Sequence, residues 1–336
     1  MGAYHLMCMA LQELTRKGIE ISAEEQQAAK IAILLHDVGH GPYSHALEQV
    51  LAEGIHHEKI SLLIIEELNK KFEGKLQTAQ EIFTGSYHKK FLHQLVSGQL
   101  DVDRMDYLTR DSFFSGVIEG YVAYDRILKM ITVHNGELMV EEKGIYSIEK
   151  FLISRRLMYR QVYLHKTVLS AEQMLQRIIK RAKFIAAQCQ QPLNSFINEP
   201  LQNITLKQFC SIDDADVMMA IKSWCSHSDK ILSLLCRGII DRQLLKVKYS
   251  SYPSDENMVA EKRRETAGKL NISEVDAGWL VFTGEANSST YNFENQQIKI
   301  LFKDGSVKDI SQVDDALINE SLRGNIKKYY ICYPGF

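Results

Sequence analysis

The chain has 336 residues, of which 45% are hydrophobic and 24% are charged, and its formal net charge is −2. This composition is typical of a soluble globular protein with one large domain or two ordinary ones. A nearly neutral chain has no overall attraction to nucleic acid or to an anionic membrane, so recognition of phosphate has to rest on local groups.

Proline is scarce, with 5 in the chain, and long segments have helical periodicity, which predicts a mainly α-helical protein. The first helix is expected over residues 2–16. Ser22 and Glu25 have the S-x-x-E spacing of a capping box, so they predict the start of a second helix. The late part of that helix, residues 31–35, is apolar on nearly every side and is expected to be buried. Further helices are expected over residues 44–53, 57–72, 78–84, 88–97, 100–112, 213–224 and 227–238, and one or two over 145–189.

Two runs of β-type residues flank Asn135-Gly136, a dipeptide that predicts a two-residue hairpin. After about residue 241 the composition changes, because β-type runs recur near residues 244–249, 278–283, 298–302 and 329–333, with a turn at Asp304-Gly305. We therefore expect a mainly α fold in three parts. These are a helical core over residues 1–190, a helical extension over 191–240, and a smaller C-terminal α+β region over 241–336, whose role the sequence leaves open.

The six cysteines are widely spaced and form no CxxC pair, which argues against a zinc knuckle or a disulfide framework and predicts reduced thiols in the cytoplasm. No apolar run approaches the roughly 20 residues of a membrane-spanning helix. The chain does not open with a cationic segment followed by an apolar one, so we expect no secretion signal.

The stretch from residue 31 to residue 48 carries the strongest functional signal. An apolar run delivers His36-Asp37 to the point where Gly39 ends regular structure, and His40 and His45 follow at once. A histidine beside a carboxylate supplies a nitrogen and an oxygen ligand for a divalent metal. The alternative is two core histidines and a helix-capping aspartate. Four groups of metal-ligand type within ten residues favour a site.

A second acidic segment spans residues 101–111. On a helix, Asp103, Tyr107 and Asp111 would stack on one face, with Arg104 and Arg110 at its border. A solvent-exposed face linked by salt bridges is the alternative. Apolar residues at the intervening positions give the helix a partly buried edge, and Asp103 could supply the further oxygen that a hard divalent cation prefers.

A third segment carries Arg155, Tyr159, Tyr163 and Lys166, which are expected to lie within one narrow arc of a single helix. Two cations and two phenols suit an anionic ligand that bears a ring. An ordinary amphipathic surface explains the same residues equally well. At the start of another helix, His57 is a proton shuttle or a surface histidine with equal support from its spacing.

Several catalytic motifs are absent. The sequence contains no G-x-x-x-x-G-K-[ST] or G-x-G-x-x-G loop for phosphate and no G-x-S-x-G serine nucleophile. A metal-activated water is therefore the nucleophile that the sequence supports best.

These segments resemble known motifs. His36-Asp37 followed by Val-Gly-His-Gly-Pro-Tyr-Ser-His resembles the signature of the HD-domain phosphohydrolases, and more narrowly of their deoxynucleoside triphosphate triphosphohydrolase branch. The segment 101–111 resembles the second motif of that branch, and 155–166 resembles the third. The resemblance runs from Gly2 to about residue 185 and implies an all-helical HD-domain core. It also implies one divalent metal, without distinguishing Mn, Mg, Fe, Ni or Zn.

The resemblance implies roles for individual residues. The implied metal ligands are His36, Asp37 and Asp103. The implied catalytic residues, around the α-phosphate and the attacking water, are His40, His45 and His57, with Glu48 as the acidic group that orients them. The implied phosphate contacts are Arg104, Arg155 and Lys166, and the implied wall for sugar and base is Tyr107, Asp111 and Tyr163. Arg104 stands where the family can carry Lys, which preserves the charge but not the geometry.

The start of the chain departs from the family pattern. The family's first ligand histidine precedes a Ser-Leu-Gly whose glycine corresponds to Gly2, so this histidine would lie two residues before Met1, and a nearby arginine would also be missing. His5 points round the helix from the required position. We therefore expect the native chain to begin upstream of Met1.

The resemblance implies hydrolysis of a deoxynucleoside triphosphate, dGTP or a similar one, to a deoxynucleoside and triphosphate. It also implies assembly into a homo-oligomer, while nothing in the sequence indicates a membrane or nucleic-acid partner. Two alternatives stay open. One is another HD-type nucleotide phosphohydrolase that acts on a monophosphate or cyclic nucleotide. The other is a catalytically impaired nucleotide-binding sensor or scaffold, because one metal ligand would be missing.

Overall fold

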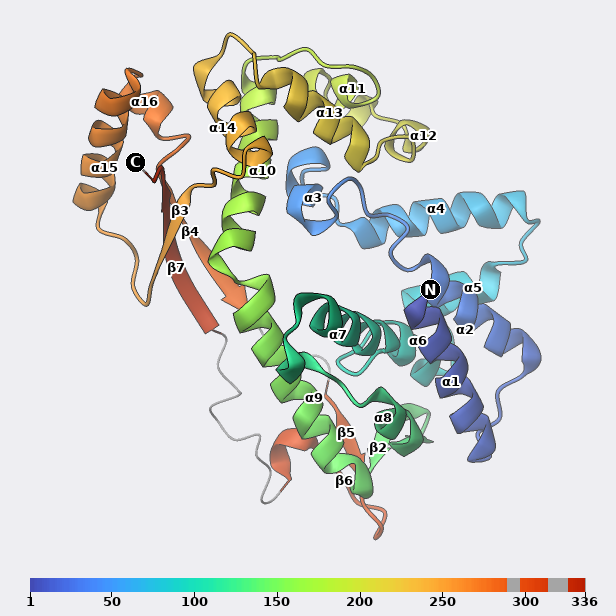
Figure 1. Cartoon of the computed structure of the whole chain (residues 1–336). Helices are drawn as coiled ribbons and strands as arrows, with labels where there is room; N and C mark the ends of the chain where they lie inside the picture. Colours follow the sequence, from blue (N-terminus) through green and yellow to red (C-terminus); the bar gives the residue numbers. More distant parts are fainter. Residues whose placement is uncertain (289–296, 314–325, 336) are drawn as a thin grey trace. The chain divides into compact units, whose positions relative to one another are not determined.

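A computed structural model describes residues 1–288, 297–313 and 326–335 (Figure 1). The chain divides into two compact units, each built from separate segments. The first comprises Met1–Val38, Ser61–Val162 and Ser288–Asn325, and the second comprises Gly39–Ile60, Tyr163–Asn287 and Ile326–Phe336. The expected mainly helical fold is confirmed, and so is the mixed α and β content of the C-terminal region. The three-part division expected from the sequence stays a prediction.

Helices make up most of the first unit, and all of them except α8 lie where the sequence predicted helices. Their bounds are α1 (Gly2–Arg16), α2 (Ala23–Leu35), α5 (Gln77–Thr84), α6 (Lys90–Val96), α7 (Val102–Ser115), α8 (Tyr124–Met130) and α9 (Ile145–Met158). α4 (His57–Lys71) begins in the second unit and continues in the first. Short 3-10 turns lie at Ile118–Gly120, Glu142–Gly144 and Ile310–Gln312.

The expected capping box at the start of α2 is confirmed. The Ser22 hydroxyl accepts a hydrogen bond from Glu25 N at 3.1 Å, and the Glu25 carboxylate accepts one from Ser22 N at 2.8 Å. The expected burial of residues 31–35 is wrong in part, because Leu34 is 49% exposed while Ala32 and Ile33 are buried. α2 packs against α1 and α5, so only one side of the helix enters the core.

The expected hairpin at Asn135-Gly136 is confirmed. β1 (Ile131–His134) and β2 (Glu137–Glu141) pair antiparallel, and both turn residues have positive φ, 52° at Asn135 and 77° at Gly136. β2 also pairs in parallel with β5 (Lys299–Leu301), which pairs antiparallel with β6 (Val307–Asp309). The sheet order is therefore β1-β2-β5-β6, and a distant part of the chain extends the hairpin inside the first unit.

The second unit is built around the long helix α10 (Lys166–Phe184), which packs against α3 (His45–Leu51), α14 (Lys230–Ile240) and the strand β3 (Lys246–Ser250). The other helices are α11 (Leu193–Asn198), α12 (Leu206–Phe209), α13 (Asp214–Trp224), α15 (Glu256–Leu270) and α16 (Glu274–Ala277), with a 3-10 turn at Leu201–Asn203. A three-stranded sheet has the order β3-β7-β4, with β7 at Ile326–Tyr333 and β4 at Phe282–Ser288.

The helix expected to carry the third motif is interrupted. α9 ends at Met158, a π-helical turn spans Tyr159–Tyr163, and α10 begins at Lys166 after His165 as its N-cap. The His165 side chain accepts a hydrogen bond from Thr167 N at 3.3 Å. The single narrow arc expected for the third motif is therefore wrong, because the wider turn and the new cap change the helical register.

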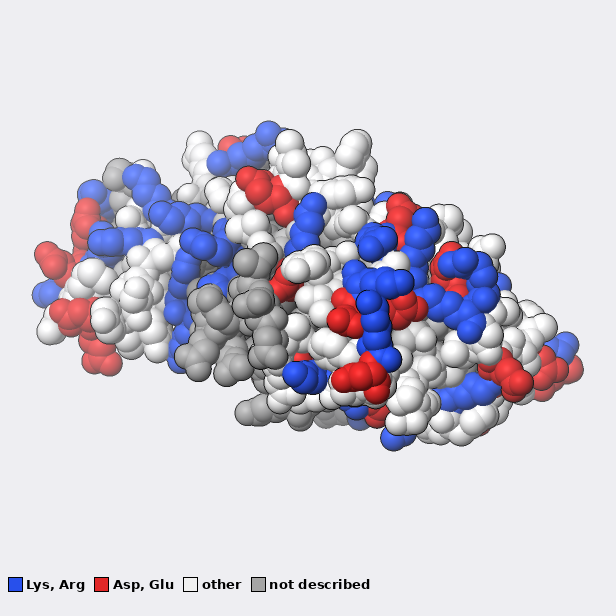
Figure 2. Space-filling view, turned by 90° about the horizontal axis from the view of Figure 1, so that it is seen from below, with Lys and Arg blue, Asp and Glu red and all other residues white. Residues whose placement is uncertain are grey.

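Two expectations about the whole chain can be compared with the described residues. None of the helices among them combines the length and the apolar character that crossing a bilayer requires. All six cysteines are free, as expected from their spacing. Acidic and basic side chains are interspersed over much of the face seen in Figure 2, in keeping with the net charge of −2.

Candidate active site

Two helix ends bring the His36-Asp37 pair and Asp103 together within the first unit. His36 is the C-terminal cap of α2, and Asp103 lies in the first turn of α7. The Nε2 atom of His36 is 3.3 Å from Asp37 Oδ2 and 3.6 Å from Asp103 Oδ1. One ligand atom from each residue lies within 4.8 Å of the other two, so the three residues could hold a metal ion.

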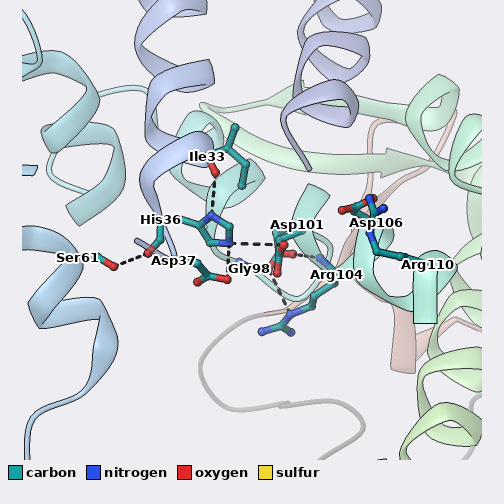
Figure 3. Close-up of polar contacts among 10 residues, drawn as sticks. Ile33, His36, Asp37, Ser61, Gly98, Asp101, Arg104, Asp106 and Arg110 are labelled. Carbon is teal, nitrogen blue, oxygen red and sulfur yellow. Dashed lines mark hydrogen bonds and ion pairs between the residues drawn. The ribbon is translucent and has the colours of Figure 1, made fainter. Parts of the chain in front are cut away.

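The orientation of the His36 ring is set by its other nitrogen (Figure 3). Nδ1 lies 2.8 Å from the carbonyl oxygen of Ile33 and donates to it, so the lone pair of the neutral ring is on Nε2. The backbone of His36 is held as well, because its carbonyl accepts a hydrogen bond from Ser61 Oγ at 2.8 Å. Nε2 is buried and has no hydrogen-bond partner among the described residues. A lone pair facing two carboxylates calls for a cation, so these residues fit a divalent metal.

The electrostatics of His36 lead to the same conclusion. Burial alone would lower the pKa of His36, but the contact with Asp103 and the charges of Asp37 and Asp103 raise it to about 9. In the absence of a metal, the ring therefore carries a proton at neutral pH. Either a proton or a metal ion supplies the positive charge that the two carboxylates require.

Asp101 caps the helix that carries Asp103 (Figure 3). Its carboxylate accepts hydrogen bonds from Arg104 N at 2.7 Å and Gly98 N at 3.0 Å, and it lies 3.2 Å from Arg104 Nε. Burial raises the pKa of Asp101 to about 6, against the opposing effect of Arg104 and the two backbone donors. Asp101 was not among the residues expected in the site, although an aspartate directly before an apolar helix is an N-cap signal.

The side-chain oxygen of Gln99 contacts two arginines. Its Oε1 accepts a hydrogen bond from Arg155 Nη1 at 2.9 Å and lies 3.5 Å from Arg104 Nη1. Arg155 is only 5% exposed, and its Nε has no hydrogen-bond partner among the described residues. Burial lowers the pKa of Arg155, and the nearby charge of Arg104 lowers it further. Two adjacent guanidinium groups, one with an unused buried donor, suit a phosphate. No spacing in the sequence pointed to Gln99.

The remaining substrate residues expected from the sequence fall in both units. Tyr107 and Asp111 lie on α7 in the first unit, one and two turns after Asp103. Burial, together with the neighbouring Tyr159, raises the pKa of Tyr107, so its phenol stays protonated and can donate a hydrogen bond. Tyr163 and Lys166 belong to the second unit, at the end of the π-helical turn and the start of α10.

The second unit holds a cluster of imidazoles around Glu48. Glu48 Oε2 lies 3.3 Å from Nδ1 of both His45 and His57, and Glu48 Oε1 accepts a hydrogen bond from His57 N at 2.9 Å. The rings of His40 and His57 stack with centroids 3.9 Å apart. Burial alone would raise the pKa of Glu48, but the His57 N–H and the side chains of His45 and His57 lower it to about 2. Glu48 therefore stays ionised and can orient the imidazoles.

The loop that carries His40 is fixed inside the second unit. Tyr43 and Ser44 have φ values of 55° and 45°, a left-handed conformation that is uncommon for residues other than glycine. Tyr43 N donates a hydrogen bond of 2.8 Å to Asp214 Oδ1 at the start of α13. This contact holds the turn just before His45 begins α3. The cluster of His40, His45, Glu48 and His57 could also hold a metal ion.

Comparison with known proteins identifies the family. Residues 3–111 match the HD domain, and residues 122–276 match the HD associated region. A crystal structure of a phosphohydrolase from Bacteroides thetaiotaomicron is 44% identical to this chain, with a TM-score of 0.94, and the match covers 99% of this chain and 86% of that one. The chain belongs to the HD-domain phosphohydrolase family. This result confirms the resemblance on which the expected helical core was based.

Two further relatives of this HD-domain phosphohydrolase are curated proteins. The Bacillus subtilis protein YwfO is 29% identical over an alignment of 356 positions, gaps included. The alignment covers 99% of this chain and 79% of YwfO. A SAMHD1 homolog from Dictyostelium discoideum, named a deoxynucleoside triphosphate triphosphohydrolase, is 29% identical over 180 residues. That match covers 48% of this chain and 35% of the relative.

The raised pKa of His36 predicts that metal affinity depends on pH. A metal ion and a proton compete for Nε2, so affinity for Mn²⁺ should rise by about tenfold per pH unit up to about pH 9 and level off above it. Calorimetry between about pH 6 and pH 9, in two buffers of different ionisation enthalpy, would measure both the affinity and the proton released. A metal affinity that is constant over this range, without proton release, would contradict the assignment of Nε2 as a ligand.

Proposed function

We propose that this HD-domain phosphohydrolase converts deoxynucleoside triphosphates, dGTP or a similar one, to the deoxynucleoside and intact triphosphate. The observation that carries the proposal is the grouping of His36, Asp37 and Asp103 within 4.8 Å in the first unit. The buried Arg155 and the half-buried Arg104 of the same unit, suited to phosphate, give further support. The named activity of the Dictyostelium relative supports the choice of substrate class.

The metal would be held by His36, Asp37 and Asp103. When bound there, a divalent ion would lower the pKa of a water molecule and polarise an oxygen of the α-phosphate. His36 is ready for this role because its Nδ1 bond to Ile33 O keeps Nε2 directed at the two carboxylates. The donor set of one nitrogen and two oxygens is compatible with Mn, Mg, Fe, Ni or Zn, so the proposal does not choose among them.

The phosphate contacts would come from Arg104, Arg155 and Lys166. Arg155 Nε is a buried donor without a hydrogen-bond partner among the described residues, and a phosphate oxygen would satisfy it. Gln99 keeps the Arg155 guanidinium in place by accepting from Nη1. The sugar and base would lie against Tyr107, Asp111 and Tyr163, where the protonated phenol of Tyr107 can donate a hydrogen bond.

We assign proton transfer to the imidazole cluster of the second unit. Cleavage of the bond between the α-phosphorus and the 5′-oxygen requires a base for the attacking water and a proton for the departing 5′-oxygen. We assign this to His40 or His57, with His45 beside the α-phosphate. Glu48 acts as a positioning residue, since its carboxylate contacts both His45 and His57 and stays ionised.

Two other functions are compatible with the same residues and differ in their products. Hydrolysis of a nucleoside monophosphate or a cyclic nucleotide would release no triphosphate. A sensor or scaffold would bind nucleotide without turnover. Chromatography of the products from a panel of the four dNTPs, monophosphates and cyclic nucleotides, with Mn²⁺ or Mg²⁺, separates the three functions.

The substitution Asp103→Asn tests the metal group. It removes one of two carboxylates beside His36 Nε2, so metal content should fall and triphosphate release from dGTP should drop by at least about 100-fold. Asp106→Asn is the matched control on the same helix, because Asp106 pairs with Arg110 and takes no part in the proposed site. Equal losses in both variants, or full activity in Asp103→Asn, would rule out the proposed role of Asp103.

The substitution Glu48→Gln tests the imidazole cluster separately. Without the carboxylate that orients His45 and His57, kcat should fall by about 10- to 100-fold, while metal content stays at the wild-type level. Glu53→Gln, an exposed glutamate just after α3, should change neither value. Loss of bound metal in Glu48→Gln, measured by elemental analysis, would instead place a metal ion in this cluster.

We also propose that the protein forms a homo-oligomer. Phe113, Phe114 and Ile118 are 79%, 78% and 84% exposed in the first unit, which is unusual for large apolar side chains lying so close in sequence. Replacing Phe113 and Phe114 by Ser should shift the mass measured by light scattering to that of a smaller assembly. Phe72→Ser, a change at another exposed aromatic residue, is the control. An unchanged mass in the double variant would exclude this surface as the contact.

A further inference from the structure

The strand β3 of the second unit runs beside the long helix α10 (Figure 1), and three polar contacts join the two parts of the chain. Ser170 Oγ donates a buried hydrogen bond of 2.6 Å to Leu245 O, and Leu245 N lies 3.3 Å from the sulfur of Met174. Nearer the start of the helix, the Tyr249 hydroxyl donates a hydrogen bond of 2.9 Å to the carbonyl oxygen of Leu164. The order of these contacts means that strand and helix run in opposite directions, so the end of β3 lies at the start of α10.

The Leu164 carbonyl lies where the helical path of the chain is broken. The π-helical turn ends at Tyr163, and α10 begins at Lys166 with His165 as its N-cap. Carbonyl groups at the end of a helical segment lack a partner within that segment and need another donor. The Tyr249 hydroxyl supplies a donor to Leu164, so a residue 85 positions later in the chain holds the break.

The small sheet keeps Tyr249 in one place. Tyr249 pairs with Tyr330 across β3 and β7, and the two rings meet edge to face with their centroids 6.5 Å apart. Both rings belong to the main hydrophobic core of the second unit. Burial, together with the nearby Cys332 and Glu172, raises the pKa of Tyr249, so the phenol stays protonated and can donate. A fixed ring with a protonated hydroxyl is a rigid attachment for the Leu164 carbonyl.

We propose that Tyr249 is a positioning residue, which holds Lys166 in place for the triphosphate through the carbonyl of Leu164. This inference rests on the proposed function, in which Lys166 contacts phosphate. Lys166 is exposed and is the first residue of α10, two positions after Leu164, so the direction of its side chain depends on where the break is held. The C-terminal α+β region, whose role the sequence leaves open, thereby takes part in substrate binding.

The substitution Tyr249→Phe removes only the hydroxyl and keeps the ring against Tyr330. Because Lys166 binds rather than reacts, KM for dGTP should rise by about fivefold, with kcat changed by less than about twofold. The rise should be equal for every dNTP that is hydrolysed, since a phosphate contact does not read the base. Tyr330→Phe, which removes a hydroxyl from the facing ring, is the matched control and should leave KM unchanged. An unchanged KM in Tyr249→Phe, or a rise for one base only, would overturn the role.

A double-mutant cycle asks whether the hydroxyl acts through Lys166. Lys166→Met should itself raise KM, and adding Tyr249→Phe to it should raise KM by less than about a further twofold. A further rise of about fivefold in that background would mean that Tyr249 acts through another group, and the inference would be wrong.

Hydrogen exchange follows the attachment without any substrate. Leu169 N donates to His165 O at 3.0 Å at the start of α10, so exchange of this amide should be about fivefold faster in Tyr249→Phe. The amide of Ile179, further along the same helix, should exchange at the wild-type rate. Equal exchange at Leu169 in both proteins would refute the attachment. Absence of dGTP hydrolysis in the wild-type protein would instead refute the proposed function, so the two failures are distinguishable.

Discussion

The hydrogen bond between His36 Nδ1 and the Ile33 carbonyl is the contact on which the candidate metal site depends. The last carbonyls of a helix have no intrahelical partner, so the imidazole satisfies a group that would otherwise need water. The same bond fixes the tautomer and directs Nε2 at two carboxylates. One of them, Asp103, lies in the first turn of α7, where a helix favours negative charge. The end of α2, rich in carbonyl oxygens, favours a cation. The ends of the two helices therefore both favour a positive charge beside His36, which a metal ion would supply.

The arginine pair follows from the same helix start. Asp101 caps α7 and lies beside Arg104, while Gln99, two residues earlier, accepts from Arg155 of α9. Holding a buried and a half-buried guanidinium close together is costly unless an anion lies between or beside them. The single carboxylate of Asp101 offsets part of this cost, and the unpaired Nε of Arg155 shows that part of it remains. A phosphate would supply the missing negative charge, so in the proposed function the segment 98–104 positions both a metal ligand and the phosphate contacts.

Local patterns in the sequence were sufficient for features that depend on neighbouring residues. The capping box at Ser22, the hairpin at Asn135-Gly136 and the helix periods follow from short-range chemistry, and the structure contains them. Features that depend on partners distant in the chain could not be predicted from local sequence patterns. No local signal pairs β2 with β5 across the chain, and none shows that Gln99 contacts Arg155. The sequence did not predict the π-helical turn at Tyr159–Tyr163, because its residues also fit an α-helical period. The sequence did not distinguish Asp101 as a site residue, because Asp103, two positions later, already offered an oxygen ligand for a metal.

Among the residues that the structure describes, two groups could hold a metal, and their charges distinguish them. His36, Asp37 and Asp103 combine one imidazole with two carboxylates, and the pKa of His36 rises to about 9 because the group needs a positive charge. In the second group the single carboxylate of Glu48 faces imidazoles and a backbone N–H that already stabilise it, which is why its pKa falls to about 2. A cation gains more from two carboxylates beside one imidazole than from a single carboxylate that is well hydrogen-bonded. The first group is therefore the stronger candidate for a metal site.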